Sequence, residues 1–303
     1  MKVVFLGTSG SMPTPERGSS AIALIRGREV ILFDCGEGAQ RQMVAAHIGI
    51  TRPKKIMVTH LHGDHVLGIP GLLQSMTLQG REDPLDIYGP VGTAAYVQAF
   101  TSTLGGPGFK VTIYEVQGPG VVYDSKEYRI EAVRADHSME AWSYALVEYP
   151  RPGRFHPERA RSLGVPEGFL WKRLQDGGGV DAGGRVVHPS EVMEPPRPGR
   201  KVVYSGDTRP SEGLAELAEG ADLLIHEATF DEILVERAVE DGHSTARQAA
   251  EVASKARAKR LILTHISSRY PEPALLELEA KAIFPETIAA RDLMVVEVPL
   301  RES

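Results

Sequence analysis

Residues 58–71 read VTHLHGDHVLGIPG, and four of the first eight positions carry side chains that can bind a metal. The four are His60, His62, Asp64 and His65. Only 10 of the 303 residues are histidine, so three of them within six positions are improbable by chance. The preceding KIMVT has the apolar, β-branched character of a strand, and a glycine inside the motif permits a tight turn. The stretch therefore predicts a metal site at the end of a strand.

Three further candidate ligands also follow predicted strands. They are His137 after YRIEAVRAD, Asp207 after KVVYSG and His265 after LILT. Side chains at the ends of several strands of one layered sheet converge in space, however far apart they lie in the sequence. The predicted sets are His60, His62 and His137 for one ion, Asp64, His65 and His265 for a second, and Asp207 as a bridge between them. Asp34, which ends the strand VILF, is expected to orient a ligand imidazole without binding the metal itself.

Every candidate ligand is an imidazole nitrogen or a carboxylate oxygen. Such a set suits Zn²⁺, with Mn²⁺ or Fe²⁺ as alternatives. Cys35 is the only cysteine, which excludes a zinc site built from several thiolates. Two adjacent ions can supply hydroxide near neutral pH and stabilise the entering and leaving oxygens of a displacement. We therefore expect hydrolysis, of a phosphodiester, an amide, a lactone or a thioester.

The composition is that of a globular protein, because 42% of the residues are hydrophobic and can form a substantial core. The net charge of -6 gives no overall attraction to nucleic acid, so a polyanionic substrate would need a local basic patch. The first apolar run ends at Gly7, too early for the core of a signal peptide, and no apolar run approaches 18 residues. Together with the single cysteine, this predicts a soluble cytoplasmic protein without a membrane segment.

Short β-rich runs alternate with helical patterns through most of the chain, which predicts an α/β fold with sheets covered by helices. Residues 150–200 are different, with 8 Pro and 9 Gly in 51 positions and no long apolar period. They predict an extended insertion with one short helix near residues 157–163. Nine basic residues against six acidic ones give this insertion a local charge of +3, while the rest of the chain is at -9.

HLHGDH resembles the H-x-H-x-D-H signature of the metallo-β-lactamase superfamily, and His137, Asp207 and His265 follow in that superfamily's order. The resemblance implies a four-layer αβ/βα sandwich over residues 1–303, a single domain with an extended arm inserted at 150–200. It also implies two mostly antiparallel sheets that lie face to face, helices on the outside and the metals at one edge. The motif specifies the fold and leaves the substrate open.

A finer resemblance, to the ribonuclease Z family in its short form, spans nearly the whole chain. It is carried by FLGTSGSMPTPERGSSAIAL, FDCGEGAQRQM, HLHGDHVLGIPGLLQSM, YGP, YSGDTRP, HEATF, GHSTA and LTHISSRY. It implies a zinc-dependent endoribonuclease, with two ions per subunit, that removes the 3' trailer from precursor tRNA. Hydrolysis after the discriminator nucleotide would leave a 3'-hydroxyl on the tRNA.

The same resemblance gives the inserted segment a role. In this family a flexible arm at this place binds the tRNA elbow, usually in a homodimer, and positive charge on the insertion suits phosphate contacts. Two departures concern substrate recognition. Arg17 is followed by Gly18 where the family pattern has an Arg-Asn pair, and the Gly-Pro element of the arm is replaced by PEGF at 166–169.

The resemblance also suggests the residues that assist catalysis. Asp64 would bind metal and accept a proton, and His243 paired with Glu227 would donate a proton to the departing 3' oxygen. The other interpretation of His243 and Glu227 is that they only hold ligands in place. Ser267 and Arg269, with Arg17 in the first loop, are the candidate substrate-binding residues.

Three other functions fit parts of the sequence. A phosphodiesterase for small, cyclic or aryl phosphodiesters could use the same metals but would not need a basic arm. A di-iron oxidoreductase of this fold would have a glutamate at the position of His62 and a flavin domain after it. A non-catalytic RNA-binding relative would have lost metal ligands, whereas this sequence retains all seven candidates.

Overall fold

The structure is a computed structural model that describes residues 1–301. The chain divides into two compact units. Within the described residues, the first comprises Met1–Val147 and Lys201–Pro299, and the second comprises Glu148–Arg200 with Leu300 and Arg301. All seven residues proposed from the sequence as metal ligands belong to the first unit.

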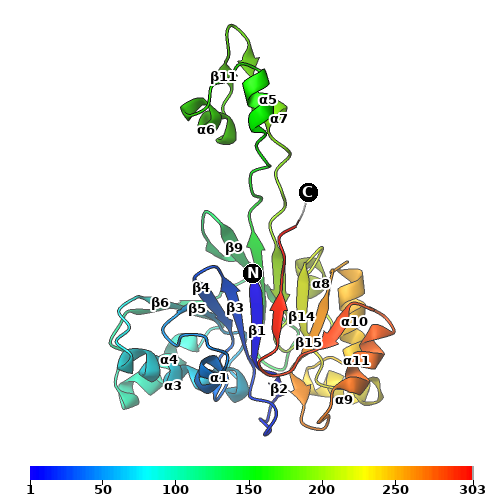
Figure 1. Cartoon of the computed structure of the whole chain (residues 1–303). Helices are drawn as coiled ribbons and strands as arrows, with labels where there is room; N and C mark the ends of the chain where they lie inside the picture. Colours follow the sequence, from blue (N-terminus) through cyan, green and yellow to red (C-terminus); the bar gives the residue numbers. More distant parts are fainter. Residues whose placement is uncertain (302–303) are drawn as a thin grey trace. The chain divides into compact units, whose positions relative to one another are not determined.

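Two seven-stranded sheets form the framework of the first unit (Figure 1). Across the first sheet the order is β18 (Val295–Glu297), β1 (Lys2–Gly7), β3 (Ala21–Arg26), β4 (Glu29–Phe33), β5 (Pro53–Met57), β6 (Leu85–Gly89) and β7 (Val111–Glu115). Across the second it is β17 (Thr287–Ala289), β15 (Leu261–Thr264), β14 (Leu223–Glu227), β13 (Lys201–Tyr204), β10 (Trp142–Glu148), β9 (Tyr128–Arg134) and β8 (Gly120–Asp124). The predicted α/β sandwich is confirmed.

The directions of the strands differ from the expected mostly antiparallel sheets. Strands β4 to β7 run parallel to one another, and so do β13, β14, β15 and β17. The antiparallel pairs lie in the other half of each sheet, such as β1 with β3 and β10 with β13. The physical reason is that helices connect the parallel strands, and a crossover of that length returns the chain in the same direction. Each sheet is therefore mixed.

Helices cover the outer faces of the two sheets. On the first sheet they are α1 (Ala39–Ala45), α3 (Gly68–Leu78) and α4 (Thr93–Leu104), and on the second α8 (Glu212–Leu217), α10 (Ala246–Lys255) and α11 (Ala274–Lys281). The helices bury apolar side chains against their own sheet, as Met43 and Leu72 do on the first and Leu214 and Leu276 on the second. No helix in the described part of the chain is long and apolar enough to cross a membrane.

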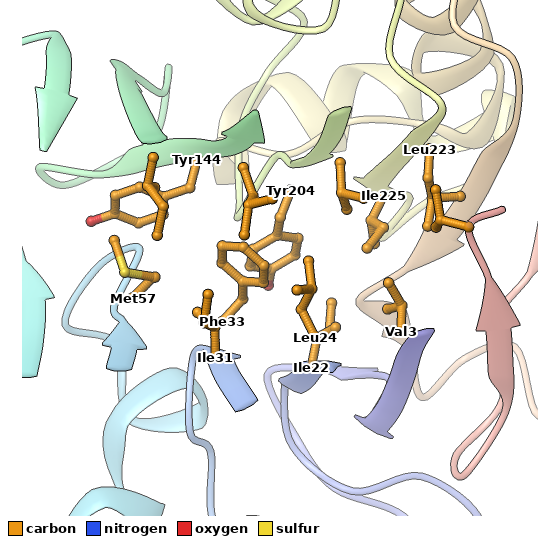
Figure 2. Close-up of a cluster of buried hydrophobic side chains, with 14 of the residues drawn as sticks. Val3, Ile22, Leu24, Ile31, Phe33, Met57, Tyr144, Tyr204, Leu223 and Ile225 are labelled. Carbon is orange, nitrogen blue, oxygen red and sulfur yellow. The ribbon is translucent and has the colours of Figure 1, made fainter. Parts of the chain in front are cut away.

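A third apolar cluster lies between the sheets and joins them. Figure 2 shows Leu24 and Phe33 of the first sheet pointing toward Tyr204 and Ile225 of the second. The rings of Phe33 and Tyr204 lie 5.8 Å apart between centroids. Burial of this apolar surface fixes the distance between the two sheets, and with it the positions of the loops that follow their strands.

The second unit has more regular structure than the sequence predicted. It contains α5 (Pro157–Ser162), α6 (Phe169–Gln175), α7 (Pro189–Val192) and the hairpin of β11 (Val180–Asp181) with β12 (Val186–Val187). One short helix was expected where α5 lies, and the other elements were not. A small core of its own includes Val165, Leu174 and Val187. These apolar residues are too far apart in the sequence to form a helical or strand period, which explains why the pattern was missed.

Candidate metal centre

The candidate ligands lie directly after strands, as the sequence predicted. His60 and His62 follow β5, and the short helix α2 (Gly63–Val66) carries Asp64 and His65. In the second sheet, His137 follows β9, Asp207 follows β13 and His265 follows β15. The structure brings the side chains of all seven residues together, although more than 200 positions separate the first from the last.

The first group of ligand atoms contains three imidazole nitrogens. His60 Nε2 lies 3.0 Å from His62 Nδ1, which lies 3.2 Å from His137 Nε2. The Asp207 carboxylate completes the group, with Oδ2 at 3.6 Å from His60 Nε2. These are the three histidines that the sequence assigned to one ion.

The second group lies beside the first. His265 Nε2 is 3.3 Å from both His65 Nε2 and Asp64 Oδ2. Asp207 Oδ2 also approaches this group, at 3.4 Å from His65 Nε2 and 3.3 Å from His265 Nε2. One carboxylate oxygen thus contacts members of both groups, which is the position required of a bridging ligand.

The chemistry of these atoms fits a pair of divalent cations. Ligand atoms arranged tetrahedrally around zinc, at bond lengths of about 2.0–2.1 Å, would lie about 3.3 Å apart. The distances within the two groups are close to that value. In addition, Asp207 Oδ1 is buried without a hydrogen-bond partner among the described residues. Since a buried carboxylate oxygen without a partner is costly, it also fits a cation at this place.

The protonation of the first group suits metal binding. Burial lowers the pKa of His60, His62 and His137, and repulsion from neighbouring imidazoles lowers it further for His60 and His62. These rings therefore stay neutral, which is the form that binds a metal. For Asp64, burial raises the pKa, but the close imidazoles of His265 and His65 outweigh burial and lower it. A carboxylate held in its charged form suits a metal ligand.

Asp34 lies behind the ligands, as the sequence predicted. Its side chain is fully buried, and Oδ2 accepts a hydrogen bond of 2.8 Å from His65 Nδ1. The Tyr204 hydroxyl donates to the same oxygen at 3.0 Å, and the Thr59 backbone N–H donates to Oδ1 at 2.7 Å. Tyr204 was not identified from the sequence, although its place three residues before Asp207 was a signal that could have drawn attention to it.

His137 is oriented by Gly242, which was not identified from the sequence either. Its Nδ1–H donates to the carbonyl of Gly242 at 2.8 Å, which leaves Nε2 toward His62. Gly242 ends α9 (Val235–Asp241) with φ of 84°, in the left-handed region. A Cβ at this position would lie 2.9 Å from His137 Nδ1 and 3.0 Å from the backbone nitrogen of Ser138. The sequence signal that could have found it is the glycine of GHSTA, because glycine readily adopts the left-handed turn and leaves room for His137 beside it.

Glu227 and His243 form a buried ion pair next to the two groups. Glu227 Oε1 lies 2.8 Å from His243 Nδ1. Burial lowers the pKa of His243, but the Glu227 carboxylate more than offsets this and raises it to about 9. His243 shares a group of converging ligand atoms with Asp207 and His265. Because its Nδ1 is occupied by Glu227, however, the pair fits a proton donor better than a ligand.

A polar cavity of about 270 Å³ adjoins His243. Its lining includes Ser267 and Arg269, two of the residues that the sequence proposed for substrate binding. Ser11, directly after β2 (Ser9–Gly10), also lines it, and its backbone N–H donates to Asp64 Oδ2 at 2.8 Å. The segment GTSGS at 7–11 therefore lies beside the candidate ligands.

Arg17, the third residue proposed for substrate binding, is only 5% exposed. Its guanidinium donates to the Thr8 hydroxyl at 2.8 Å and to the Ala290 carbonyl at 3.0 Å, and burial lowers its pKa. These contacts tie the first loop to the segment before β18. They support a role in holding that loop better than a direct contact with substrate.

We predict that Gly242→Ala weakens metal binding at the group that contains His137. The new Cβ would displace that ring, and loss of the partner of a ligand imidazole lowers metal affinity by about tenfold to a hundredfold. Competition between the protein and a chelator for Zn²⁺ measures the change. Gly80→Ala is the matched control, since Gly80 also has positive φ, 70°, but nothing lies within 4 Å of its Cβ position. Equal affinities in both variants would contradict the prediction.

Comparison with known proteins places this geometry in a family. A model for a beta-lactamase superfamily domain matches residues 190–266, and one for the anti-Pycsar protein Apyc1 matches residues 1–148. The chain is 48% identical to ribonuclease Z of Methanosarcina acetivorans over 308 residues, which covers 99% of both chains. It is 47% identical to ribonuclease Z of Methanothermobacter thermautotrophicus, covering 100% of this chain and 98% of the relative.

The same family appears among solved structures. The crystal structure of human tRNase Z, short form, superposes with a TM-score of 0.74 at 31% identity, covering 99% of this chain and 100% of the human one. Full-length identity near one half, together with this shared architecture, excludes a resemblance confined to the metal motif. The chain belongs to the ribonuclease Z family.

Proposed function

We propose that the protein is a metal-dependent endoribonuclease that processes the 3' end of tRNA. It hydrolyses precursor tRNA after the discriminator nucleotide, removes the 3' trailer and leaves a 3'-hydroxyl on the tRNA. The observation that carries the proposal is the pair of adjoining ligand groups that share Asp207, in a chain 48% identical to a ribonuclease Z over its full length.

The proposed cofactor is a pair of Zn²⁺ ions per subunit, with Mn²⁺ or Fe²⁺ as possible replacements. His60, His62 and His137 would hold one ion, Asp64, His65 and His265 the other, and Asp207 would contact both. When bound, such a pair lowers the pKa of water and neutralises charge that develops on phosphate oxygens. The support for zinc is the ligand chemistry, which consists of imidazole nitrogen and carboxylate oxygen without thiolate.

The remaining catalytic work is assigned to this chain's own side chains. His243, with Nδ1 bound to Glu227, has Nε2 available to give a proton to the departing 3' oxygen. The pKa of His243 is raised to about 9, so the ring is protonated at neutral pH and can give its proton to the departing oxygen. Asp64 is proposed as ligand and as acceptor of the proton from the attacking water, and of these two roles its lowered pKa supports the first.

The cavity beside His243 is the proposed site for the nucleotides next to the cleaved bond. Arg269 supplies a positive charge there and Ser267 a hydroxyl, which suits a phosphate and a sugar or base edge. Arg17 acts on the substrate through the loop that it holds in place.

The decisive experiment is incubation of the zinc-loaded protein with a precursor tRNA that carries a 3' trailer. We expect a single cut after the discriminator nucleotide, and loss of at least about a thousandfold in rate for Asp64→Ala, which removes a proposed ligand. Metal analysis of the active sample should give about two ions per chain. Rapid hydrolysis of a small phosphodiester without any cut in the precursor would refute the tRNA assignment and favour a phosphodiesterase of the same fold.

The second unit, Glu148–Arg200, is proposed as the flexible arm that binds tRNA. Part of its positive charge is neutralised internally, as Arg161 pairs with Glu158 and Arg200 with Glu148. Arg154, Arg159 and Arg173 are exposed and have no ion pair with any described residue. These three are the arginines available to phosphates.

Two aromatic residues of the arm have separate roles in this proposal. The indole N–H of Trp171 donates to the Val165 carbonyl at 3.0 Å, and its ring packs on Phe155. Trp171 therefore belongs to the core of the arm. Phe169 is 78% exposed at the start of α6, near the exposed Arg173, and is available to stack on a base.

Replacing Arg154, Arg159 and Arg173 together by alanine should raise the KM for precursor tRNA by about tenfold or more. The slope of the logarithm of the binding constant against the logarithm of the salt concentration should become less steep, by about one for each phosphate that the variant no longer neutralises. Cleavage of a small phosphodiester should be unchanged. A matched triple variant, Arg28, Arg247 and Arg257 to alanine, changes the net charge equally outside the arm and should keep the original KM. Equal effects of the two triple variants would contradict the role of the arm.

A homodimer in the cytoplasm completes the proposal. The resemblance to ribonuclease Z supports the dimer, and the single cysteine, buried at position 35, supports a reducing compartment. Light scattering of the purified full-length chain should give about twice the mass of 33.0 kDa, and a mass of one chain at the concentrations used for activity would contradict it.

A further inference from the structure

Two buried threonine hydroxyls each lie between a carboxylate and a candidate ligand. Thr59 Oγ1 is 2.8 Å from Asp34 Oδ2 and 3.0 Å from His60 Nδ1. Thr229 Oγ1 is 2.8 Å from Glu227 Oε2 and 2.9 Å from His265 Nδ1. Thr59 is 0% exposed and Thr229 4%, so water does not compete for these hydroxyls.

The direction of these hydrogen bonds follows from the number of protons. A threonine hydroxyl has one proton, and an ionised carboxylate can only accept. The Thr59 hydroxyl therefore donates to Asp34, and its contact with His60 Nδ1 requires that nitrogen to carry the proton. Thr229 has a second oxygen in reach, the His265 carbonyl at 3.1 Å. Whichever oxygen receives its proton, His265 Nδ1 has to donate to the threonine.

We infer that Thr59 and Thr229 are positioning residues that fix His60 and His265 as the Nδ1–H tautomer, with Nε2 turned toward the metals. The orientation of the rings agrees with this assignment. His60 Nε2 lies 3.0 Å from His62 Nδ1, inside the first ligand group. His265 Nε2 lies 3.3 Å from Asp64 Oδ2, inside the second.

Each carboxylate thereby serves two imidazoles. Asp34 binds His65 directly, at 2.8 Å, and reaches His60 through Thr59. One buried acid thus orients one ligand from each group. Glu227 binds His243 directly and reaches His265 through Thr229. Glu227, which keeps the proposed proton donor His243 in its charged form, therefore also orients His265, a ligand of the second group.

The inference rests on the metal-binding part of the proposed function, and titration with Zn²⁺ alone tests it without RNA. Thr59→Val and Thr229→Val keep the shape of the side chain and remove the hydroxyl. Each should weaken one of two zinc equivalents by about tenfold to a hundredfold, as measured by competition with a chelator. The double variant should weaken both. Thr59→Ser and Thr229→Ser restore a hydroxyl and should bind zinc more like the unsubstituted chain than like the valine variants.

Thr93→Val is the control, because Thr93 is equally buried but its hydroxyl donates only to the Pro90 carbonyl, outside the ligand groups. It should bind both zinc equivalents normally. Valine variants that retain both equivalents at full affinity, or serine variants as weak as the valine ones, would overturn the inference. An unsubstituted chain that binds no zinc would instead refute the proposed metal centre itself.

A spectroscopic measurement on the unsubstituted chain does not depend on the folding of any variant. Long-range nitrogen–proton correlation spectra of the zinc-loaded, ¹⁵N-histidine-labelled protein report which ring nitrogen carries the proton. His60 and His265 should carry it on Nδ1. His62, which presents Nδ1 to the ligand group, should carry it on Nε2 and serves as the internal reference. A proton on Nε2 of His60 or His265 would overturn the assignment.

Discussion

The burial of one carboxylate, Asp34, is the constraint on which the arrangement of this centre depends. A charged group without access to water has to be fully hydrogen-bonded, or the structure around it loses several kcal/mol. Its partners come from three places in the chain: His65 in α2, Thr59 after β5 and Tyr204 at the end of β13. The hydrogen bonds to Asp34 therefore join the two sheets at the point where the ligands follow their strands.

The same residue type performs two tasks in this centre because the surroundings differ. His60, His62 and His137 are crowded by other imidazoles and by the protein interior, which favours their neutral form. His243 faces Glu227, and a pKa of about 9 keeps it charged. Neutral rings bind metals and a charged ring can give up a proton, so the neighbours of these four histidines suit them to different tasks. The rule does not extend to His65, a proposed ligand whose pKa is lowered by burial but raised overall by Asp207 and Asp34.

Much of the centre could be predicted because ligands at strand ends follow a simple rule of sheet geometry. His137, Asp207 and His265 each come directly after a strand, and their convergence needs no knowledge of the packing. Tyr204, Gly242 and Thr229 act through hydrogen bonds that depend on side-chain directions, and no sequence period encodes those. The mixed strand directions were missed for a related reason, since the pairing of β4 with β5 is set by the helix between them.

Helices α9 and α11 and the small core of the second unit were not predicted from the sequence. Few of the apolar residues of these helices are buried, namely Ala238 in α9 and Leu276 and Ala280 in α11, and the sequence alone does not distinguish them from the exposed ones. Leu276 of α11, for example, is buried in the apolar cluster that also contains Ala249 of α10 and Leu263 of β15. The residues of α11, ALLELEAK, are good helix formers, but which of them are buried is decided by the tertiary packing.

The place where the second unit is inserted has a consequence for how the protein can change. β10 and β13 are antiparallel neighbours, with Tyr144 opposite Tyr204, so the chain leaves and re-enters the sheet at adjacent strands. Glu148–Arg200 thus occupies the position of a hairpin turn. The entropy of closing a loop grows only with the logarithm of its length, and the register of the two strands is set by their own pairing. The length and sequence of this segment can therefore vary during evolution with little effect on the sheet that carries Asp207.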